Sequence, residues 1–103
     1  MAEKLLRDFY LGFIRIHILY HAHKAQVYGL ELMGELGKHG YAVGPGTLYP
    51  ILHTMEANGL LLSRKEVVNG KARRCYRITN KGGHILRGAQ KQAVELITEI
   101  SKE

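Results

Sequence analysis

This sequence of 103 residues has few of the features that support secretion or membrane insertion. Its single cysteine, Cys75, cannot form a disulfide within the chain, which excludes a disulfide-stabilised scaffold and indicates a reducing compartment. The most apolar run, from Phe9 to Tyr20, contains Arg15 and His17 and falls short of the roughly 18 apolar residues that span a membrane. The N-terminus alternates charged and apolar residues, unlike a signal peptide. We therefore expect a cytoplasmic protein.

Acidic residues are also in the minority. Lys and Arg number 15 against 9 for Asp and Glu, which gives a formal net charge of +6 and favours a polyanionic partner, nucleic acid before an anionic membrane. The chain has room for one compact domain. It lacks a nucleophile with a matched base, paired carboxylates and a phosphate-cradling glycine loop. We expect neither an enzyme nor a cofactor.

A helix is expected over residues 5–20, and its apolar residues occupy two sectors of the helix surface. One sector is formed by Leu6, Phe9, Tyr10, Phe13, Ile16 and Tyr20. The other sector is formed by Leu11, Ile14 and Ile18. A domain of this size covers only one of the two sectors, so the other sector predicts contact with a second subunit.

Two further helices are expected around a glycine-rich turn. The first runs from about Tyr28 to Lys38, turns Leu30, Met33 and Leu36 inward, and ends at His39-Gly40. The second has Gly44 as its N-cap and Pro45 as its first residue, and it ends near Asn58. Its inward face is predicted to hold Leu48, Ile51, Leu52 and Met55, and its outward face Thr47, Pro50, His53, Thr54 and Ala57. Because Pro50 lacks an N–H, we expect it to distort the first turn.

A β-hairpin is expected next, with strands over Leu60–Val68 and Lys71–Thr79 joined by Asn69-Gly70. A type I′ turn there pairs Val68 with Lys71, Glu66 with Arg73 and Leu61 with Ile78. One face then collects Leu61, Val67, Ala72, Tyr76 and Ile78, and the opposite face collects Arg64, Lys71, Arg73 and Arg77.

The last helix is expected after Thr79-Asn80, with an apolar seam that predicts a second subunit contact. The seam consists of Ile85, Leu86, Ala89, Ala93, Leu96, Ile97 and Ile100. The order of elements predicts a mainly α fold with a β-hairpin wing. We expect a winged helix-turn-helix DNA-binding domain over residues 1–80 and a C-terminal dimerisation helix over residues 81–103.

Four segments of the chain resemble the PadR family of bacterial transcriptional regulators. They are Tyr-Gly-Leu-Glu-Leu-Met at 28–33, Gly-Pro-Gly-Thr-Leu-Tyr-Pro-Ile-Leu at 44–52, Met-Glu-Ala-Asn-Gly-Leu at 55–60 and Tyr-Arg-Ile-Thr-Asn-Lys-Gly-Gly at 76–83. The single C-terminal helix is similar to that of the short-tailed subfamily. The resemblance implies a homodimeric, nucleoid-associated repressor that binds an inverted-repeat operator and releases it when a small, often aromatic, effector binds.

Two departures bear on what the resemblance implies. Family members usually have Ser or Thr where this chain has Gly44, so the side-chain cap of the recognition helix is absent. The chain also has no tryptophan to line an aromatic drug pocket. These departures weaken the expectation of an aromatic effector more than they weaken the expectation of operator binding.

The candidate DNA-binding residues lie on the third helix and the wing. They are Thr47, Tyr49, Pro50, His53, Thr54, Lys65, Lys71, Arg73 and Arg74. Hydroxyls and a helix N-terminus bind phosphate, side chains further along the helix reach base edges, and wing cations contact the DNA backbone. The alternative is that both surfaces are only solvated, with Tyr49 packed against the domain.

The candidate dimer interface consists of Phe9, Phe13, Ile85, Ala89, Ala93, Leu96, Ile97 and Ile100. The candidate effector residues are Tyr10, His17 and Tyr20, within an aromatic set that lines a pocket between the first and last helices or simply packs. A different functional class also fits the basic surface, namely a winged-helix protein-interaction module for an acidic partner. An operator-binding protein differs from such a module by strong preference for palindromic over random duplex.

Six histidines and the lone cysteine complete the candidates. His17 and His21 share a helix face, but no carboxylate or cysteine accompanies them at ligand spacing. We therefore expect the histidines, which also include His23, His39, His53 and His84, to serve packing or an interface, and we expect no metal site. Cys75 follows two arginines on a predicted strand, and cations that lower its pKa would make it redox-sensitive. A lone cysteine is more often an inert filler residue, and we favour that interpretation.

Overall fold

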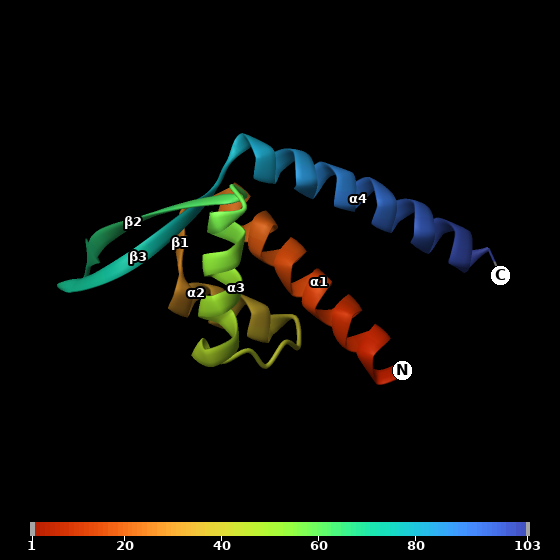
Figure 1. Ribbon diagram of the computed structural model, residues 1–103, viewed down its shortest axis with the longest axis horizontal. Coiled ribbons are helices and arrows are strands. Elements are labelled where there is room, and N and C mark those ends of the chain that lie inside the picture. Colours follow the sequence, from red (N-terminus) through yellow and green to blue (C-terminus); the bar gives the residue numbers. More distant parts are fainter. Residues whose placement is uncertain (1, 103) are drawn as a thin grey trace.

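The computed structural model describes residues 2–102, and its helices and hairpin follow the predicted order (Figure 1). The elements are α1 (Ala2–Lys24), β1 (Val27–Tyr28), α2 (Gly29–Lys38), α3 (Pro45–Ala57), β2 (Leu61–Val68), β3 (Lys71–Ile78) and α4 (Asn80–Ser101). The described chain is elongated, with principal extents of 53 × 28 × 23 Å. In Figure 1 the wing projects at one end, and α1 and α4 extend toward the other.

The core lies where α1, α2, α3 and the base of the sheet meet. From α1 it takes Ile14 and Ile18, one of the two predicted sectors, and the opposite sector remains largely exposed. In α2 the buried leucines are Leu32 and Leu36. The prediction that Leu30 points inward is wrong, because its side chain is 52% exposed. This short helix has leucine or methionine on more than one side, so its periodicity alone did not fix the buried face.

The sheet has the strand order β1-β3-β2, and the predicted hairpin register is confirmed in all three pairs. Asn69 and Gly70 have φ angles of 52° and 77°, as a type I′ turn requires. The two-residue strand β1 pairs Val27 with Tyr76 and was not predicted. The predicted apolar face of the hairpin is buried only in part. Leu61 and Tyr76 are buried at the base of the hairpin, whereas Val67 is 76% exposed because the tip of the hairpin extends beyond the core.

The start of α4 is bound tightly to the end of α3. Thr79 is the N-cap of α4: its Oγ1 accepts a hydrogen bond from the Gly82 N–H (2.9 Å) and donates one to the Gly59 carbonyl (2.6 Å). The Thr79 N–H donates to the Leu60 carbonyl (3.1 Å), and Lys81 Nζ donates to the Asn58 carbonyl (2.9 Å). These bonds fix the direction in which α4 leaves the domain.

Beyond this attachment, α4 runs outward with little cover from the rest of the described chain. Only Gly82 and Gly83 of α4 are buried, and the predicted seam stays partly or largely exposed. No helix within residues 2–102 combines the length and the apolar character needed to cross a membrane.

Candidate nucleic-acid interface

The third helix, α3, presents a polar face to solvent and an apolar face to the core, as predicted. Leu48, Ile51, Leu52 and Met55 are buried. The side chains on the other side, which are Thr47, Pro50, His53, Thr54 and Ala57, are exposed. A helix anchored by four core residues holds its outward side chains in fixed positions, as a recognition helix must.

The N-terminus of α3 is formed by backbone rather than by a side-chain cap. Gly44 is the N-cap and Pro45 the first helical residue, as predicted. The Gly44 carbonyl accepts hydrogen bonds from the N–H groups of Thr47 (3.1 Å) and Leu48 (2.9 Å). The helix continues through Pro50. Gly44 has no side chain to cap the helix, and Thr47, which is exposed, carries the first polar side chain of α3.

Tyr49 serves packing as well as the exposed surface. Its ring lies against the α-carbon of Gly29, so closely that a Cβ at residue 29 would stand 2.7 Å from Tyr49 Cε1 and Cζ. The side chain is nevertheless 43% exposed. Glycine at position 29 therefore allows α2 and α3 to approach each other. Tyr49 lies at the border of the candidate interface, and its ring is held in place by this packing.

The four candidate cations of the wing have different surroundings. The Arg73 guanidinium lies over the Tyr28 ring, 5.1 Å from its centroid. Arg74 Nη1 donates to Ser63 Oγ (3.0 Å). Lys65 and Lys71 are exposed, and neither makes an ion pair or side-chain hydrogen bond with another described residue. The two lysines are thus fully available to phosphate, and the two arginines are partly committed to the protein.

Two polar contacts join the wing to the rest of the domain. The Glu56 carboxylate at the end of α3 accepts from Ser63 Oγ (2.7 and 2.9 Å) and from the Ser63 N–H (3.2 Å), which links α3 to Arg74 through Ser63. On the other face, Glu66 accepts from Arg64 Nη2 (3.0 Å) and from Gln26. The sequence analysis predicted neither contact: Tyr28 is far from Arg73 in the sequence, and the Glu56–Ser63 bond forms only because the chain turns back from α3 into β2.

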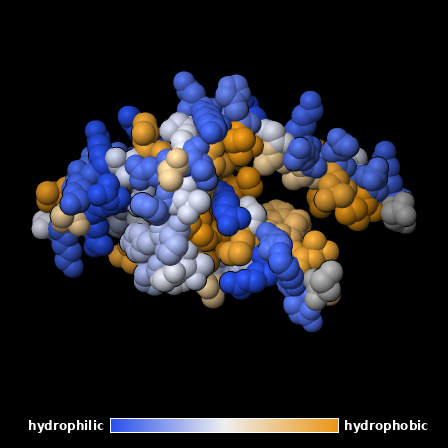
Figure 2. Space-filling view, viewed as in Figure 1, coloured by the Kyte–Doolittle hydropathy of each residue, from blue (hydrophilic) through white to orange (hydrophobic). Residues whose placement is uncertain are grey.

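Hydrophilic side chains cover much of the wing, and apolar ones gather on the two outward helices (Figure 2). In this view α1 and α4 present apolar surface to the space between them. Of the predicted dimer residues, Phe9, Phe13, Ile85, Leu96, Ile97 and Ile100 are exposed large hydrophobic residues. Phe9 and Phe13 also form an edge-to-face pair with a centroid separation of 4.6 Å. Monomers seldom leave such a continuous apolar surface uncovered.

The candidate effector residues divide between two hollows. A cavity of about 580 Å³ between α1 and α4 is lined by Phe13, Ile16, His17, Tyr20, His23, His39, Gly83, Leu86, Arg87 and Gln90. Tyr10 lies outside this cavity and borders a second hollow of about 540 Å³, where its ring is 5.2 Å from that of Tyr41. The structure thus places His17 and Tyr20 together and Tyr10 apart from them.

Cys75 is only 4% exposed and belongs to β3. Burial, with a further effect of the Glu66 carboxylate, raises the pKa of its thiol above the ordinary value of 9.0. The thiol is therefore protonated at neutral pH, in agreement with its interpretation as a filler residue.

Comparison with known proteins agrees with this architecture. Residues 18–88 match the model of the "Transcriptional regulator PadR-like family". The protein named "Transcriptional regulator Rv3488" from Mycobacterium tuberculosis is 47% identical over 95 residues, which cover 92% of this chain and 89% of that protein.

Solved structures of the same family share the fold. The PadR-like regulator BC4206 of Bacillus cereus has a TM-score of 0.84 at 30% identity, with 92% of this chain and 94% of that chain covered. A PadR family regulator of Eggerthella lenta has a TM-score of 0.80 at 28% identity, with 98% and 89% covered. The winged fold, the exposed face of α3 and these matches together show that the chain belongs to the PadR-like family of DNA-binding transcriptional regulators, not to a family of enzymes.

Proposed function

We propose that this regulator is a repressor that binds an inverted-repeat operator as a homodimer and releases it when a small aromatic effector binds. Residues 1–80 then form the DNA-binding domain and residues 81–103 the dimerisation helix. The observation that carries the proposal is the pairing of two surfaces on one rigid domain. One is the exposed polar face of α3 with the lysines of the wing, and the other is the uncovered apolar surface of α1 and α4.

The DNA contact follows from the chemistry of the exposed groups. Thr47, at the N-terminal end of α3, is placed to bind a phosphate, where its hydroxyl adds to the positive end of the helix dipole. His53 lies further along the same face, where a recognition helix reaches base edges in the major groove. Lys65 and Lys71 extend the contact to the backbone of the flanking DNA. Binding to an operator would place the protein on the cytoplasmic nucleoid.

The dimer follows from the apolar surface. Leu96, Ile97 and Ile100 belong to the part of α4 that extends past the domain, and Phe9 and Phe13 lie on the exposed sector of α1. A second copy that packs its own α1 and α4 against these residues removes both surfaces from water at once. Such a two-fold dimer presents two α3 helices, which is the arrangement that reads an inverted repeat.

The effector site is assigned to the cavity between α1 and α4. Its volume of about 580 Å³ lies within the range of small-molecule sites, and Phe13, Tyr20 and Leu86 supply apolar and aromatic lining. Because α1 and α4 are also the elements assigned to the dimer, a ligand between them would alter the spacing of the two α3 helices. This coupling is how an effector would release the operator.

Selection of bound duplexes from a random pool tests the DNA-binding part of the proposal. We expect a palindromic consensus, bound by two chains, with affinity at least about 10³-fold above that of a scrambled duplex at the same salt concentration. Fluorescence anisotropy with the selected duplex measures this ratio. Equal affinity for the palindrome and the scrambled duplex would contradict operator recognition and would favour the protein-interaction alternative.

A further inference from the structure

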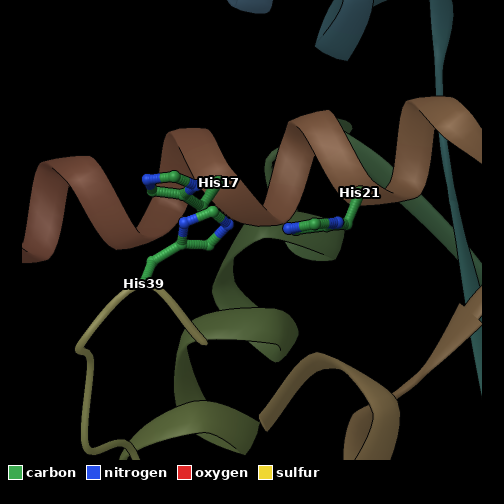
Figure 3. Close-up of side chains that lie close together, drawn as sticks. All are labelled: His17, His21 and His39. Carbon is green, nitrogen blue, oxygen red and sulfur yellow. The ribbon is translucent and has the colours of Figure 1, made fainter. Parts of the chain in front are cut away.

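Three histidines from two separate elements converge beside the α1–α4 cavity (Figure 3). His17 and His21 lie one turn apart on α1, and His39 is the C-cap of α2. Each residue contributes one ring nitrogen to a group of three atoms that all lie within 4.8 Å of one another. The ring centroids of His17 and His39 are 4.5 Å apart, and those of His21 and His39 are 6.0 Å apart.

We propose that His17, His21 and His39 bind a divalent transition-metal ion such as Zn²⁺, with a fourth position open to water or another ligand. Three imidazole nitrogens are a common donor set for zinc, copper and nickel. With Zn–N bonds of about 2.0–2.1 Å, tetrahedral ligand atoms stand about 3.4 Å apart. The three nitrogens lie within 4.8 Å of one another, so ion binding would require the side chains to close by no more than about 1.4 Å.

The surroundings of the rings also point to a ligand. His21 Nε2 is buried and has no hydrogen-bond partner among the described residues, a costly state that a metal ion would relieve. In Figure 3 the far end of the His21 ring is directed along α1 toward the other two rings. None of the three side chains makes a hydrogen bond with another described residue, so ion binding breaks no existing bond.

The charge around the cluster is compatible with a cation. Burial, and the neighbouring histidines in addition, lower the pKa of His17. Burial likewise lowers the pKa of His21; the Glu35 carboxylate partly opposes this, and His39, Lys24 and Lys38 add to the lowering. A lowered pKa favours the neutral form of the ring, which is the form that binds metal. Glu35 supplies a nearby negative charge, although it also pairs with Lys38 (3.2 Å).

The site would connect α1 to the segment that leads into α3. His39 ends α2, and only residues 40–44 separate it from the first residue of α3. An ion held by all three residues therefore links the helix assigned to the dimer and effector cavity with the approach to the recognition helix. This regulatory role, unlike the metal site itself, rests on the proposed function.

Zinc titration of the full chain tests the site. The protein is first treated with a chelator and dialysed, and Zn²⁺ is then added in a calorimeter. We expect one Zn²⁺ per chain for the wild type and for the control His84→Gln, which changes an exposed histidine outside the cluster. His39→Gln is expected to weaken binding by at least about tenfold. No binding by the wild type, or unchanged affinity in His39→Gln, would overturn the site.

Co²⁺ supplies a second measurement that separates an ordered site from loose surface binding. Tetrahedral Co²⁺ absorbs visible light much more strongly than the hydrated ion, and we expect that absorption with the wild type and His84→Gln but not with His17→Gln. Circular dichroism checks that each variant is folded. A spectrum of hydrated Co²⁺ with the folded wild type would overturn a three-histidine site.

The regulatory role has its own test. We compare operator affinity in excess Zn²⁺ and in chelator, and expect a change of at least about fivefold for the wild type that is absent in His39→Gln. If zinc binds as expected but operator affinity is the same in both conditions, the regulatory role is overturned and the metal site stands. If no operator is found at all, the proposed function fails independently of the zinc titration.

Discussion

The α-carbon of Gly82, in the first turn of α4, lies directly against the main-chain carbonyl of Leu60, in the connection between α3 and β2. A Cβ at residue 82 would stand 3.2 Å from the Leu60 carbonyl carbon and 2.7 Å from Ile78 Cγ1. The Leu60 carbonyl belongs to the main chain and also accepts a hydrogen bond from the Thr79 N–H (3.1 Å), so it cannot move aside as a flexible side chain could. The close approach of α4 to the connection between α3 and β2 therefore depends on the absence of a side chain at residue 82.

Gly82→Ala should destabilise the fold by about 1–3 kcal/mol, because an overpacked contact with backbone outweighs the better helix propensity of alanine. The neighbouring Gly83→Ala is the matched control. A Cβ at residue 83 meets only Arg87 Nη1, at an ordinary contact distance of 3.5 Å. We expect wild-type stability or slightly more from this control. Urea unfolding measures both free energies, and equal values for the two variants would contradict the argument.

The sequence predicted those parts of the fold that local patterns determine. A two-residue Asn69-Gly70 turn leaves a single register for the hairpin, and the register was confirmed over the full length of both strands. The face of α3 followed from helical periodicity, because its apolar residues lie on one side. The strand β1 has only two residues and no alternation to detect, and it exists because β3 offers it an edge.

The candidate site was less predictable, because its properties depend on contacts between distant segments. Arg73 and Lys71 are equivalent in the sequence, and only the fold places Tyr28 under the Arg73 guanidinium. Likewise, helical spacing brought His17 and His21 together, but His39 joins them through the packing of α2 against α1. Such contacts leave no periodic signal in the sequence.

The free cation at the tip of the wing gives a prediction on salt dependence. Lys71→Ala should weaken binding to the selected palindrome and to scrambled DNA by similar factors. It should also lower the slope of log affinity against log salt concentration by about 0.9, the value for one lost phosphate contact. Lys91→Ala, in the middle of α4 and outside the candidate interface, is the control and should keep the wild-type slope. A wild-type slope in Lys71→Ala would remove this lysine from the interface.

The apolar surface of α4 gives a prediction on assembly. The Ile97 side chain is 60% exposed within one chain, so Ile97→Asp should leave the monomer fold nearly intact. In the proposed dimer the same change buries a charge, and we expect sedimentation velocity at micromolar concentration to show monomers. Thr98→Asp introduces the same charge one residue further along α4, off the seam, and should remain dimeric. A wild-type monomer, or a dimeric Ile97→Asp variant, would count against this interface.

The raised pKa of Cys75 predicts an unreactive thiol. The folded chain should hold less thiolate at a given pH than the unfolded chain, because the pKa is raised above 9.0. The folded protein should therefore react with a disulfide reagent at pH 7 much more slowly than the protein in denaturant. Because folding raises this pKa, the associated stability is present below pH 9.0 and is lost as the pH rises further. Rates measured with and without denaturant check this expectation, with Cys75→Ser as the blank. Equal rates at pH 7 would contradict it.

The final prediction separates base recognition from electrostatic attraction, because any basic protein gives a salt-dependent affinity. His53 and Thr47 are exposed on α3, opposite the buried Leu48, Ile51 and Leu52. His53→Ala and Thr47→Ala should therefore change the free energy of unfolding by no more than about 0.5 kcal/mol. Urea unfolding establishes this point first, so that a loss of DNA binding is not attributed to a damaged fold.

DNA binding should then distinguish the two variants. His53→Ala removes a group expected to meet base edges, so it should cost about 1–3 kcal/mol on the selected palindrome and little on scrambled DNA. Thr47→Ala removes a phosphate contact that fixes register, so it should weaken both duplexes. Titration of both variants against both duplexes at one salt concentration provides the comparison. If His53→Ala weakens the two duplexes equally, or neither of them, α3 does not read bases through His53, and any sequence preference must come from another candidate residue or from the shape of the DNA.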